Sequence, residues 1–151
     1  MAPLDIPFIS VTADMPGLTP TQSANLGRVC QVIQDRLREP DLTLGKVAAA
    51  SGISPRYVQK LLHNVGQGFA GYVRDCRLER CRADLADRCL GSLSITEICF
   101  RWGFNDAAHF SRSFRARYGL APKDFRKASG VRWDEAWARM NCAERAAALA
   151  H

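Results

Sequence analysis

The residues from 102 to 119 combine an aromatic stripe with a row of arginines. Phe110, Phe114 and Tyr118 recur every four residues, which places them on one face of a helix. The other faces carry three guanidinium groups: Arg112, Arg115 and Arg117. A guanidinium group donates hydrogen bonds in a planar fork that matches phosphate oxygens or the edge of guanine. The spacing therefore predicts a helix that is anchored by aromatic side chains and contacts an anionic polymer.

The front of the same helix carries small side chains, Ala107, Ala108 and Ser111. Small side chains permit close approach to another surface, and an alanine methyl can pack on the methyl group of thymine. His109 also lies here, and packing at the helix front or a phosphate contact suits it better than a role as a catalytic base. The alternative interpretation is a solvated, charged face on an ordinary helical bundle.

A second stretch repeats this pattern about 52 residues earlier. The segments are "LGKVAAASGI-SPRYVQKLL" and "ITEICFRWGFNDAAHFSRSF", with one extra residue in the second turn. The matching pairs are Val47 with Ile98, Ala48 with Cys99, Gly52 with Gly103, Ser54 with Asp106, Val58 with Phe110, Lys60 with Arg112 and Leu62 with Phe114. Each copy predicts a short helix, a glycine turn and a capped second helix, which together form a helix-turn-helix.

The second helix of such a unit enters the major groove of DNA and reads bases near its N-terminal end. Ala48 and Cys99 are small where the second helix must cross the first, and a glycine can end the first helix in the left-handed conformation. In the first unit, Arg56, Gln59 and Lys60 can all donate hydrogen bonds to base edges. We therefore expect more hydrogen-bonded readout from the first unit than from the second.

The remaining pattern is helical throughout, which predicts an all-α fold. Apolar positions from residue 22 to Leu37 indicate a helix that stops before Pro40. Thr43 and Ser54 are expected caps, Ser94 and Glu97 form a capping box, and Leu93 with Ile98 fits a hydrophobic staple. A helix of roughly 18 residues follows Gly68 and links the two units over about 27 Å.

Charge is concentrated in the middle of the 151-residue chain. Of its 21 Lys and Arg residues, 18 fall within 22–127, together with 10 of its 15 acids, so this segment carries +8. A basic unit of this kind suits a polyanion partner, although a basic surface alone would look the same. Because the chain has no long apolar run and no signal-peptide pattern, we expect a cytoplasmic location.

The six cysteines form no C-x-x-C pair, so we expect small buried hydrophobes in a reducing compartment. No catalytic constellation is visible, and we predict no enzyme activity, no cofactor and no metal. Two rival classes remain. A DNA-repair or thiol-sensing protein would need a clustered cysteine group, and a protein-interaction module that does not bind DNA would carry acids at the reader positions.

Residues 22–127 resemble the DNA-binding domain of the AraC/XylS family of bacterial transcription regulators. The resemblance is strongest in "SITEICFRWGFNDAAHFSRSFRARYGLAPKDFR", which is similar to the family signature around the second helix-turn-helix. The segments "VAAASGISPRYVQKLL" and Arg77-Leu78-x-x-Cys81 also match. Cys81 and Cys99 stand where the family commonly has alanine, and the spacer "HNVGQG" is one residue shorter than the commonest pattern.

The resemblance implies a homeodomain-like fold of two helix-turn-helix subdomains, with recognition helices that enter successive major grooves, usually to activate promoters. It implies double-stranded DNA and RNA polymerase as partners, and an effector domain or partner chain that is not present here. We expect either a stand-alone DNA-binding unit or the C-terminal part of a longer protein, because 21 preceding residues are too few for an effector domain.

The expected organisation has three parts. Residues 1–21 form a linker or flexible arm, 22–127 the DNA-binding domain, and 128–151 a helical tail that packs on the domain or contacts another protein. Within the domain we expect helix-turn-helix units at about 43–64 and 94–118, linked by a helix at about 69–86. The predicted DNA-contacting residues are Ser54, Arg56, Tyr57, Gln59, Lys60, His63, Ala107, Ala108, Ser111, Arg112 and Arg115.

Overall fold

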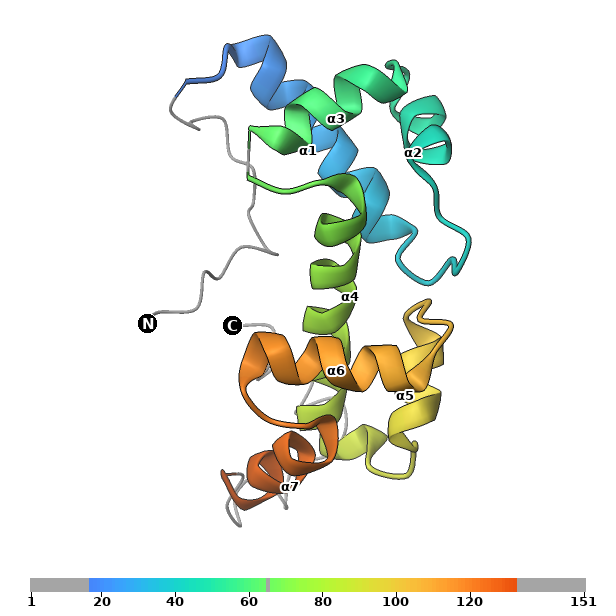
Figure 1. Ribbon diagram of the computed structural model, residues 1–151, viewed down its shortest axis with the longest axis vertical. Helices are drawn as coiled ribbons and strands as arrows, with labels where there is room; N and C mark the ends of the chain where they lie inside the picture. Colours follow the sequence, from blue (N-terminus) through green and yellow to red (C-terminus); the bar gives the residue numbers. More distant parts are fainter. Residues whose placement is uncertain (1–16, 65, 133–151) are drawn as a thin grey trace. The chain divides into compact units, whose positions relative to one another are not determined.

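The computed structural model describes residues 17–64 and 66–132, in which helices are joined by turns and short irregular segments (Figure 1). No strand occurs within these ranges, so the predicted all-α class is confirmed. None of the helices in them is both long and apolar enough to cross a membrane. In chain order they are α1 Pro20–Asp35, α2 Leu44–Ser51, α3 Pro55–His63, α4 Phe69–Ala86, the 3-10 helix η1 Arg88–Leu90, α5 Ile95–Arg101, α6 Ala107–Tyr118 and α7 Pro122–Arg132.

Two compact units divide the chain between Arg77 and Leu78. The first unit holds α1, α2, α3 and the beginning of α4. The second holds the rest of α4 with η1, α5, α6 and α7. The boundary falls inside α4, which is one uninterrupted helix of 18 residues and matches the predicted linking helix. Each unit has its own core.

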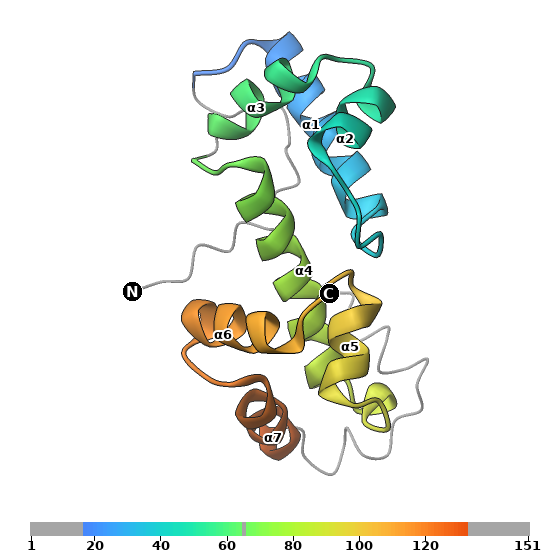
Figure 2. The same ribbon diagram turned by 45° about the vertical axis from the view of Figure 1, so that its right-hand side comes forward.

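The core of the first unit is aliphatic. Helices α1, α2 and α3 contact one another pairwise, and Figure 2 shows α2 lying beside α1. The side chains that meet between them are almost completely buried: Leu26, Val29, Ile33, Val47, Val58, Leu61 and Leu62. These positions are the apolar ones of the sequence pattern, so periodicity alone identified this core.

Helix α1 differs from its prediction at both ends. It begins at Pro20, because Thr19 and Gln22 form a capping box that the sequence analysis missed. It ends at Asp35 rather than near Pro40, since the backbone turns out of the helix at Arg36. Leu37 is nevertheless buried, and the Arg77 guanidinium donates to the carbonyl oxygens of Leu37 and Glu39 at 3.0 and 2.6 Å. Arg77 thus satisfies carbonyl groups that lie beyond the helix end.

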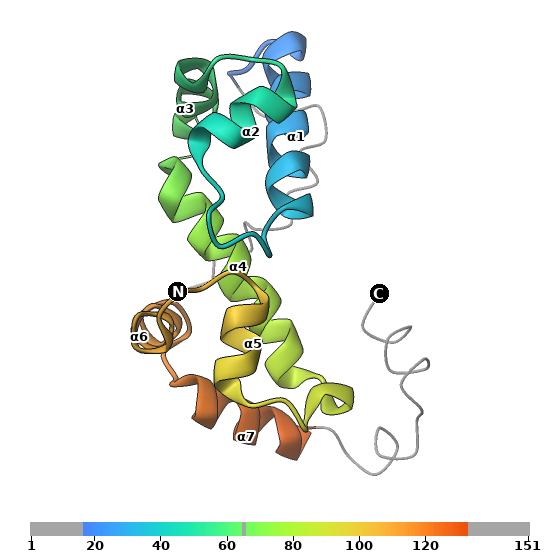
Figure 3. The same cartoon turned by 90° about the vertical axis from the view of Figure 1, so that its right-hand side faces the viewer.

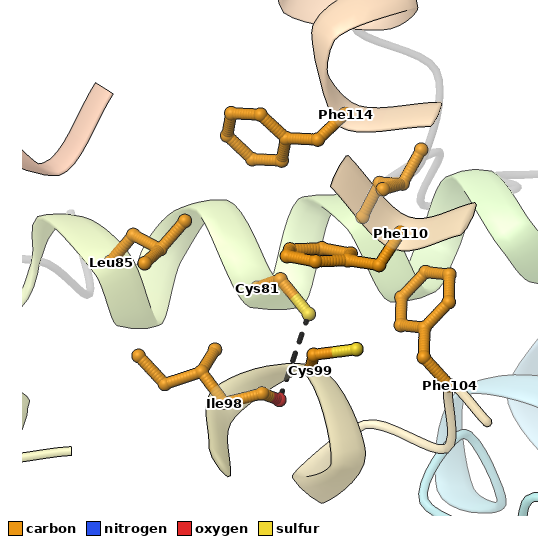
Figure 4. Close-up of a cluster of buried hydrophobic side chains, with 8 residues drawn as sticks. Cys81, Leu85, Ile98, Cys99, Phe104, Phe110 and Phe114 are labelled. Atoms are coloured by element: carbon orange, nitrogen blue, oxygen red, sulfur yellow. Dashed lines mark hydrogen bonds between the residues drawn. The ribbon is translucent and has the colours of Figure 1, made fainter. Parts of the chain in front are cut away.

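Aromatic rings build the core of the second unit (Figure 4). Phe110 and Phe114 of α6 are fully buried, with ring centroids 5.7 Å apart, and Phe104 lies 5.0 Å from Phe110. Phe114 also meets Tyr118 at 4.6 Å and Phe125 of α7 at 5.5 Å, the latter edge-on. Tilted and edge-on contacts are the favoured arrangements of aromatic pairs. The predicted aromatic anchor of α6 is therefore confirmed.

The predicted caps are also confirmed. Thr43 Oγ1 accepts from the Lys46 N–H at 3.2 Å, and the Ser94 and Glu97 side chains bond reciprocally to the backbone N–H groups at 3.0 and 2.7 Å. Leu93 packs on the buried cluster that contains Ile98, as a hydrophobic staple requires. These local contacts set where α2 and α5 begin.

Four cysteines are buried free thiols, as predicted: Cys30, Cys76, Cys81 and Cys99. The Cys81 thiol donates to the Ile98 carbonyl oxygen at 3.8 Å. Burial, together with the charge of Asp106, raises the pKa of Cys99 to about 11, and burial raises the pKa of Cys30. Cys89 is disulfide-bonded, so the prediction of a reduced thiol was wrong there.

Two predicted segments lie mostly outside the described residues. These are the arm at 1–21, of which only 17–21 are described, and the amphipathic tail helix expected after Gly130. Helix α7 continues to Arg132, past the predicted domain end at residue 127. The division into arm, domain and tail stays a prediction.

Replacing Phe114 by alanine should lower the free energy of unfolding by about 3–5 kcal/mol, because it removes a fully buried ring. Phe100 on α5 provides a matched control, since it is 49% exposed and its replacement should cost less than about 0.5 kcal/mol. Denaturant unfolding followed by circular dichroism measures both. Equal losses for the two variants would contradict this account of the core.

The buried thiols should react slowly under native conditions. Ellman's reagent at neutral pH should leave Cys30, Cys76, Cys81 and Cys99 unmodified until the chain is unfolded, because they are buried and thiolate is the reactive form. Mass spectrometry of the labelled peptides identifies each site. Rapid native labelling of any of the four would support the thiol-sensing class instead.

Candidate nucleic-acid interface

The same turn joins the two helices in both repeats. Gly52 has φ 72° and Gly103 has φ 89°, the left-handed region in which glycine is unstrained. The residue after each glycine donates its N–H back to the first helix, from Ile53 to the Ala48 carbonyl oxygen and from Phe104 to that of Cys99, both at 3.2 Å. These are Schellman-type bonds. The sequence repeat is therefore also a repeat of backbone geometry.

The first helix of each pair buries its small residue where the second helix crosses. Ala48 and Cys99 are 1% and 0% exposed. Figure 3 views α6 nearly along its axis and α5 from the side, so these two helices cross rather than run parallel. A larger side chain at either position would push the second helix away from the first.

The second helix of each pair begins at the predicted cap. Ser54 Oγ accepts from the Tyr57 N–H at 3.2 Å. Asp106 Oδ1 accepts from the N–H groups of Ala108 and His109, at 2.8 and 3.3 Å. Hydrogen bonds from the His109 and Ala108 N–H groups lower the pKa of Asp106, and the nearby charges of Arg112 and His109 lower it further. The Asp106 carboxylate is therefore charged at neutral pH.

Helix α3 presents long polar side chains to solvent. Val58, Leu61 and Leu62 face the core, whereas the exposed positions are Ser54, Arg56, Gln59, Lys60 and His63. Tyr57 differs from these because it is half-buried and its hydroxyl accepts from Asn25 Nδ2 of α1 at 3.3 Å. Tyr57 is thus held against α1, and its role as a DNA contact stays a prediction.

Helix α6 presents a different surface. Ala108, Arg112 and Arg115 are exposed, whereas Ala107 and Ser111 are half-buried. The reason is helical spacing: each of these two small residues lies two turns before an aromatic anchor, Ala107 before Phe114 and Ser111 before Tyr118. They therefore sit at the edge of the packed face rather than at the centre of the exposed one.

His109 is an exposed residue that the predicted contact set omitted. It lies in the first turn of α6, the turn that reads bases in helix-turn-helix proteins. The internal repeat contains the signal that identifies it, because His109 matches Tyr57 of α3, which the predicted set includes. Its imidazole can donate to or accept from a base edge.

The cationic side chains on the exposed faces of α3 and α6 are uncommitted, which means that they form no ion pair or side-chain hydrogen bond within the part of the chain that the structure describes. No ion pair or side-chain hydrogen bond there involves Arg56, Lys60, Arg112 or Arg115. Most other exposed lysine and arginine side chains of the two units have partners. Lys46 pairs with Asp41 at 2.6 Å, for example, and Arg74 pairs with Asp75 at 3.7 Å. Uncommitted guanidinium and ammonium groups on one helix face can bind phosphate without first breaking an internal contact.

Arg117, expected from sequence to suit a phosphate, is engaged inside the second unit. Its Nε lies 3.7 Å from Glu79 Oε1 of α4 and donates to the Tyr118 hydroxyl at 3.3 Å. The Tyr118 hydroxyl in turn donates to Glu79, and Arg82 donates to the other Glu79 oxygen at 3.1 Å. Burial and then the Glu79 contact raise the pKa of Tyr118, so its hydroxyl stays protonated. The network fastens the last turn of α6 to α4.

A second carboxylate on α4 holds the end of α5. Trp102 Nε1 donates to Asp84 Oδ2 at 2.6 Å, and Arg101 lies 3.8 Å from the same oxygen. Arg80 stacks over the Trp102 ring, with its guanidinium carbon 5.6 Å from the ring centroid. Glu79 and Asp84 together position α6 and α5 against α4.

The described residues hold no group of three or more His, Cys, Asp or Glu side chains placed to ligate a metal ion. The exposed faces of α3 and α6 instead carry hydrogen-bond donors and positive charge, on helices that are capped at their N-termini. This chemistry suits recognition of a polyanion rather than a reaction.

Comparison with known proteins gives the class to which this geometry belongs. A family model described as a helix-turn-helix domain matches residues 47–128. The chain is 37% identical over 122 residues to the "Transcriptional activator NphR" of a Rhodococcus species, covering 77% of this chain and 36% of that protein. It is 35% identical over 96 residues to the "Transcriptional activator RhrA" of Rhizobium meliloti, covering 63% and 30%. The chain thus spans about a third of the length of these relatives.

Solved structures of transcription regulators are similar to this chain as well. A transcriptional regulator with an AraC-type DNA-binding domain from Chromobacterium violaceum superimposes with a TM-score of 0.66 at 25% identity, over 74% of this chain and 96% of that one. The C-terminal domain of AraT, a response regulator from Geobacillus stearothermophilus, has a TM-score of 0.61 at 28% identity, over 69% and 84%.

The chain belongs to the AraC-type helix-turn-helix family, a family of DNA-binding transcription regulators and not of enzymes. The resemblance inferred from the sequence is confirmed.

Proposed function

We propose that this chain is the sequence-specific DNA-binding part of a transcription activator, with α3 and α6 as its two recognition helices. The observation that carries the proposal is the repeated exposed face, in which uncommitted Arg56, Lys60, Arg112 and Arg115 lie on helices that are capped and buried on their other side. The proposed DNA-binding domain covers 22–127, and its contacts are the eleven predicted residues together with His109.

Each helix is proposed to enter a major groove, and the two grooves are successive. The repeat supports this, because equivalent helices in equivalent units suit equivalent half-sites. Selection of bound duplexes from a random pool tests it directly. The selected sequences should contain two conserved blocks whose centres are one helical turn, about 10–10.5 base pairs, apart. A single conserved block would contradict the two-helix model.

Activation is proposed from the relatives, two of which are named transcriptional activators. It would require contact with RNA polymerase at a promoter, in the cytoplasm where bacterial DNA lies. We also propose that an effector domain or partner chain acts with this domain, since the matched segment covers only 36% and 30% of the two relatives. In vitro transcription from a promoter that carries the selected site tests activation, and reduced transcript would indicate a repressor.

DNA affinity should depend strongly on salt, because bound Lys and Arg displace counterions from phosphates. Arg115→Ala should reduce the log–log salt slope by about one, since Arg115 is exposed and uncommitted. Arg117→Ala is the matched control and should leave the slope unchanged, because Arg117 is held by Glu79. Fluorescence anisotropy from low to physiological salt measures all three proteins. A wild-type slope near zero would exclude phosphate-driven binding.

Gln59→Ala should relax base preference at one position of the first half-site, because a bidentate amide contact is worth about 1–3 kcal/mol of discrimination. Arg115→Ala should instead weaken binding to all sequences alike. Binding of each variant to a panel of single-base changes in the selected site measures this difference. If Gln59→Ala weakens every sequence equally and Arg115→Ala alters base preference, the assignment of the two faces is wrong.

A further inference from the structure

Two side chains of α1 contact the joint between α2 and α3. Asn25 and Arg28 lie three residues apart on α1, which makes them neighbours on the helix surface. The Arg28 guanidinium donates to the Ser51 carbonyl oxygen at 3.3 Å, and Asn25 Nδ2 donates to the Tyr57 hydroxyl oxygen at 3.3 Å. Ser51 is the last residue of α2, and Tyr57 lies in the first turn of α3. This polar edge of α1 therefore holds both sides of the glycine turn.

The direction of the bond between Asn25 and Tyr57 decides which hydrogen bonds Tyr57 can still make. A hydroxyl group has one proton and two acceptor lone pairs. Because the Asn25 amide donates, the bond occupies a lone pair of the Tyr57 oxygen and leaves the hydroxyl proton for another acceptor. A hydroxyl that accepts one hydrogen bond is also polarised into a stronger donor. Asn25 thus fixes Tyr57 against α1 as a hydrogen-bond donor.

Tyr57 lies where such a donor would meet the DNA backbone. It is half-buried at the edge of the face that α3 exposes, between exposed Arg56 on one side and buried Val58 on the other. Phosphate oxygens accept hydrogen bonds, and tyrosine hydroxyls are among the groups that donate to them. A donor at the edge of a recognition helix suits a phosphate that borders the groove, whereas Arg56 and Gln59 are placed to reach base edges.

We infer that Asn25 is a positioning residue for DNA binding, which by donating to Tyr57 leaves the Tyr57 hydroxyl proton to bond a phosphate oxygen of the first half-site. The inference rests on the proposed function of α3 as a recognition helix. Asn25 acts through Tyr57 and needs no contact with DNA. A carboxylate in its place would have the opposite effect, because it would take the hydroxyl proton and leave only lone pairs, which cannot bond a phosphate oxygen.

The test is a double-mutant cycle on the full 151-residue chain, with the duplex selected from the random pool. Tyr57→Phe removes only the hydroxyl group. Asn25→Asp keeps the size of the side chain but, when ionised, can only accept hydrogen bonds. Asn25→Ala removes the hydrogen bond without adding a charge. Each Asn25 variant is made in the wild-type and in the Tyr57→Phe background, and fluorescence anisotropy gives Kd.

Tyr57→Phe should weaken binding about tenfold, because it removes a hydrogen bond to a charged group. The loss from Asn25→Asp should be about tenfold larger in the wild-type than in the Tyr57→Phe background, where only repulsion between the carboxylate and DNA remains. Asn25→Ala should weaken wild-type binding about two- to threefold, because it frees the tyrosine ring to move, and should leave Tyr57→Phe unchanged. Gln31→Ala is the matched control and should change neither background, since it removes an exposed amide of α1 that bonds Asp35 instead.

Duplexes that carry a neutral methylphosphonate in place of one phosphate locate the contact. Each phosphate of the first half-site is replaced in turn. The wild-type protein should lose affinity at one position where Tyr57→Phe and Asn25→Asp lose markedly less, because these variants no longer make that bond. A purely structural role of Asn25 would lower the affinity for every duplex alike, so this measurement separates the two roles.

Four outcomes would overturn the inference. Additive effects of Asn25→Asp and Tyr57→Phe would show that Asn25 does not act through the hydroxyl. Coupling to Tyr57→Phe no larger for Asn25→Asp than for Asn25→Ala would show that the direction of the bond is irrelevant. Full affinity of Tyr57→Phe would refute the phosphate contact while the proposed function stands. Failure of the wild-type protein to bind any duplex of the pool would refute the proposed function, and the inference would fall with it.

Thermal melting by circular dichroism checks that each variant is folded. If Asn25→Asp melts early, the cycle with Asn25→Ala decides, because alanine introduces no charge beside Tyr57. Additivity in that cycle would then refute the inference.

Discussion

Both units depend on one joint, a glycine in the left-handed region between two short helices. With φ at 72° and 89°, Gly52 and Gly103 let the next residue bond back to the first helix. That bond ends the first helix and turns the chain, and the cap of the second helix follows within three residues. A side chain at the glycine would be strained in this conformation. The crossing of the two helices, and with it the choice of buried and exposed faces, follows from the joint.

The glycine joint sets the angle at which the two helices cross, and side-chain packing then stabilises that crossing. In the first unit aliphatic side chains between three helices suffice. The second unit adds an aromatic stripe and two carboxylates on α4, Glu79 and Asp84, which bind the last turn of α6 and the end of α5. A partly buried carboxylate costs free energy unless its oxygens are bonded, and here tyrosine, tryptophan and arginine supply the donors. Because hydrogen bonds are directional, these contacts constrain the positions of α5 and α6 in addition to the apolar packing.

The two units have the same backbone arrangement and differ in the side chains that their second helices expose. Helix α3 presents long side chains with donors at their ends, whereas α6 presents alanines, a histidine and arginines beside a charged cap. Two units with the same backbone arrangement can therefore contribute to DNA recognition in different ways. Helix α3 can read bases through hydrogen bonds, and α6 can combine close approach with phosphate contacts. Equal sequences on both helices would demand equal half-sites.

The sequence by itself determined the helices, their caps and the repeat, because all of these arise from contacts within a few residues. Ser54 and Ser94 cap the helices that they were expected to cap, and the apolar periodicity identified both cores. The sequence also identified the family. The DNA-contacting roles of individual residues follow from it only as predictions.

The tertiary structure decided which of the side chains predicted to contact DNA are exposed and which are held by partners within the protein. Arg115 and Arg117 look alike in the sequence, yet Arg115 is exposed and Arg117 is bound to Glu79, which lies 38 residues away in the chain. The carbonyl oxygens of Leu37 and Glu39, which lie beyond the end of α1, accept hydrogen bonds from Arg77, 40 and 38 residues further along the chain. In each case a partner distant in sequence decides the outcome. Local pattern specifies a helix and its faces, but a charged or polar side chain takes whichever partner the fold brings near.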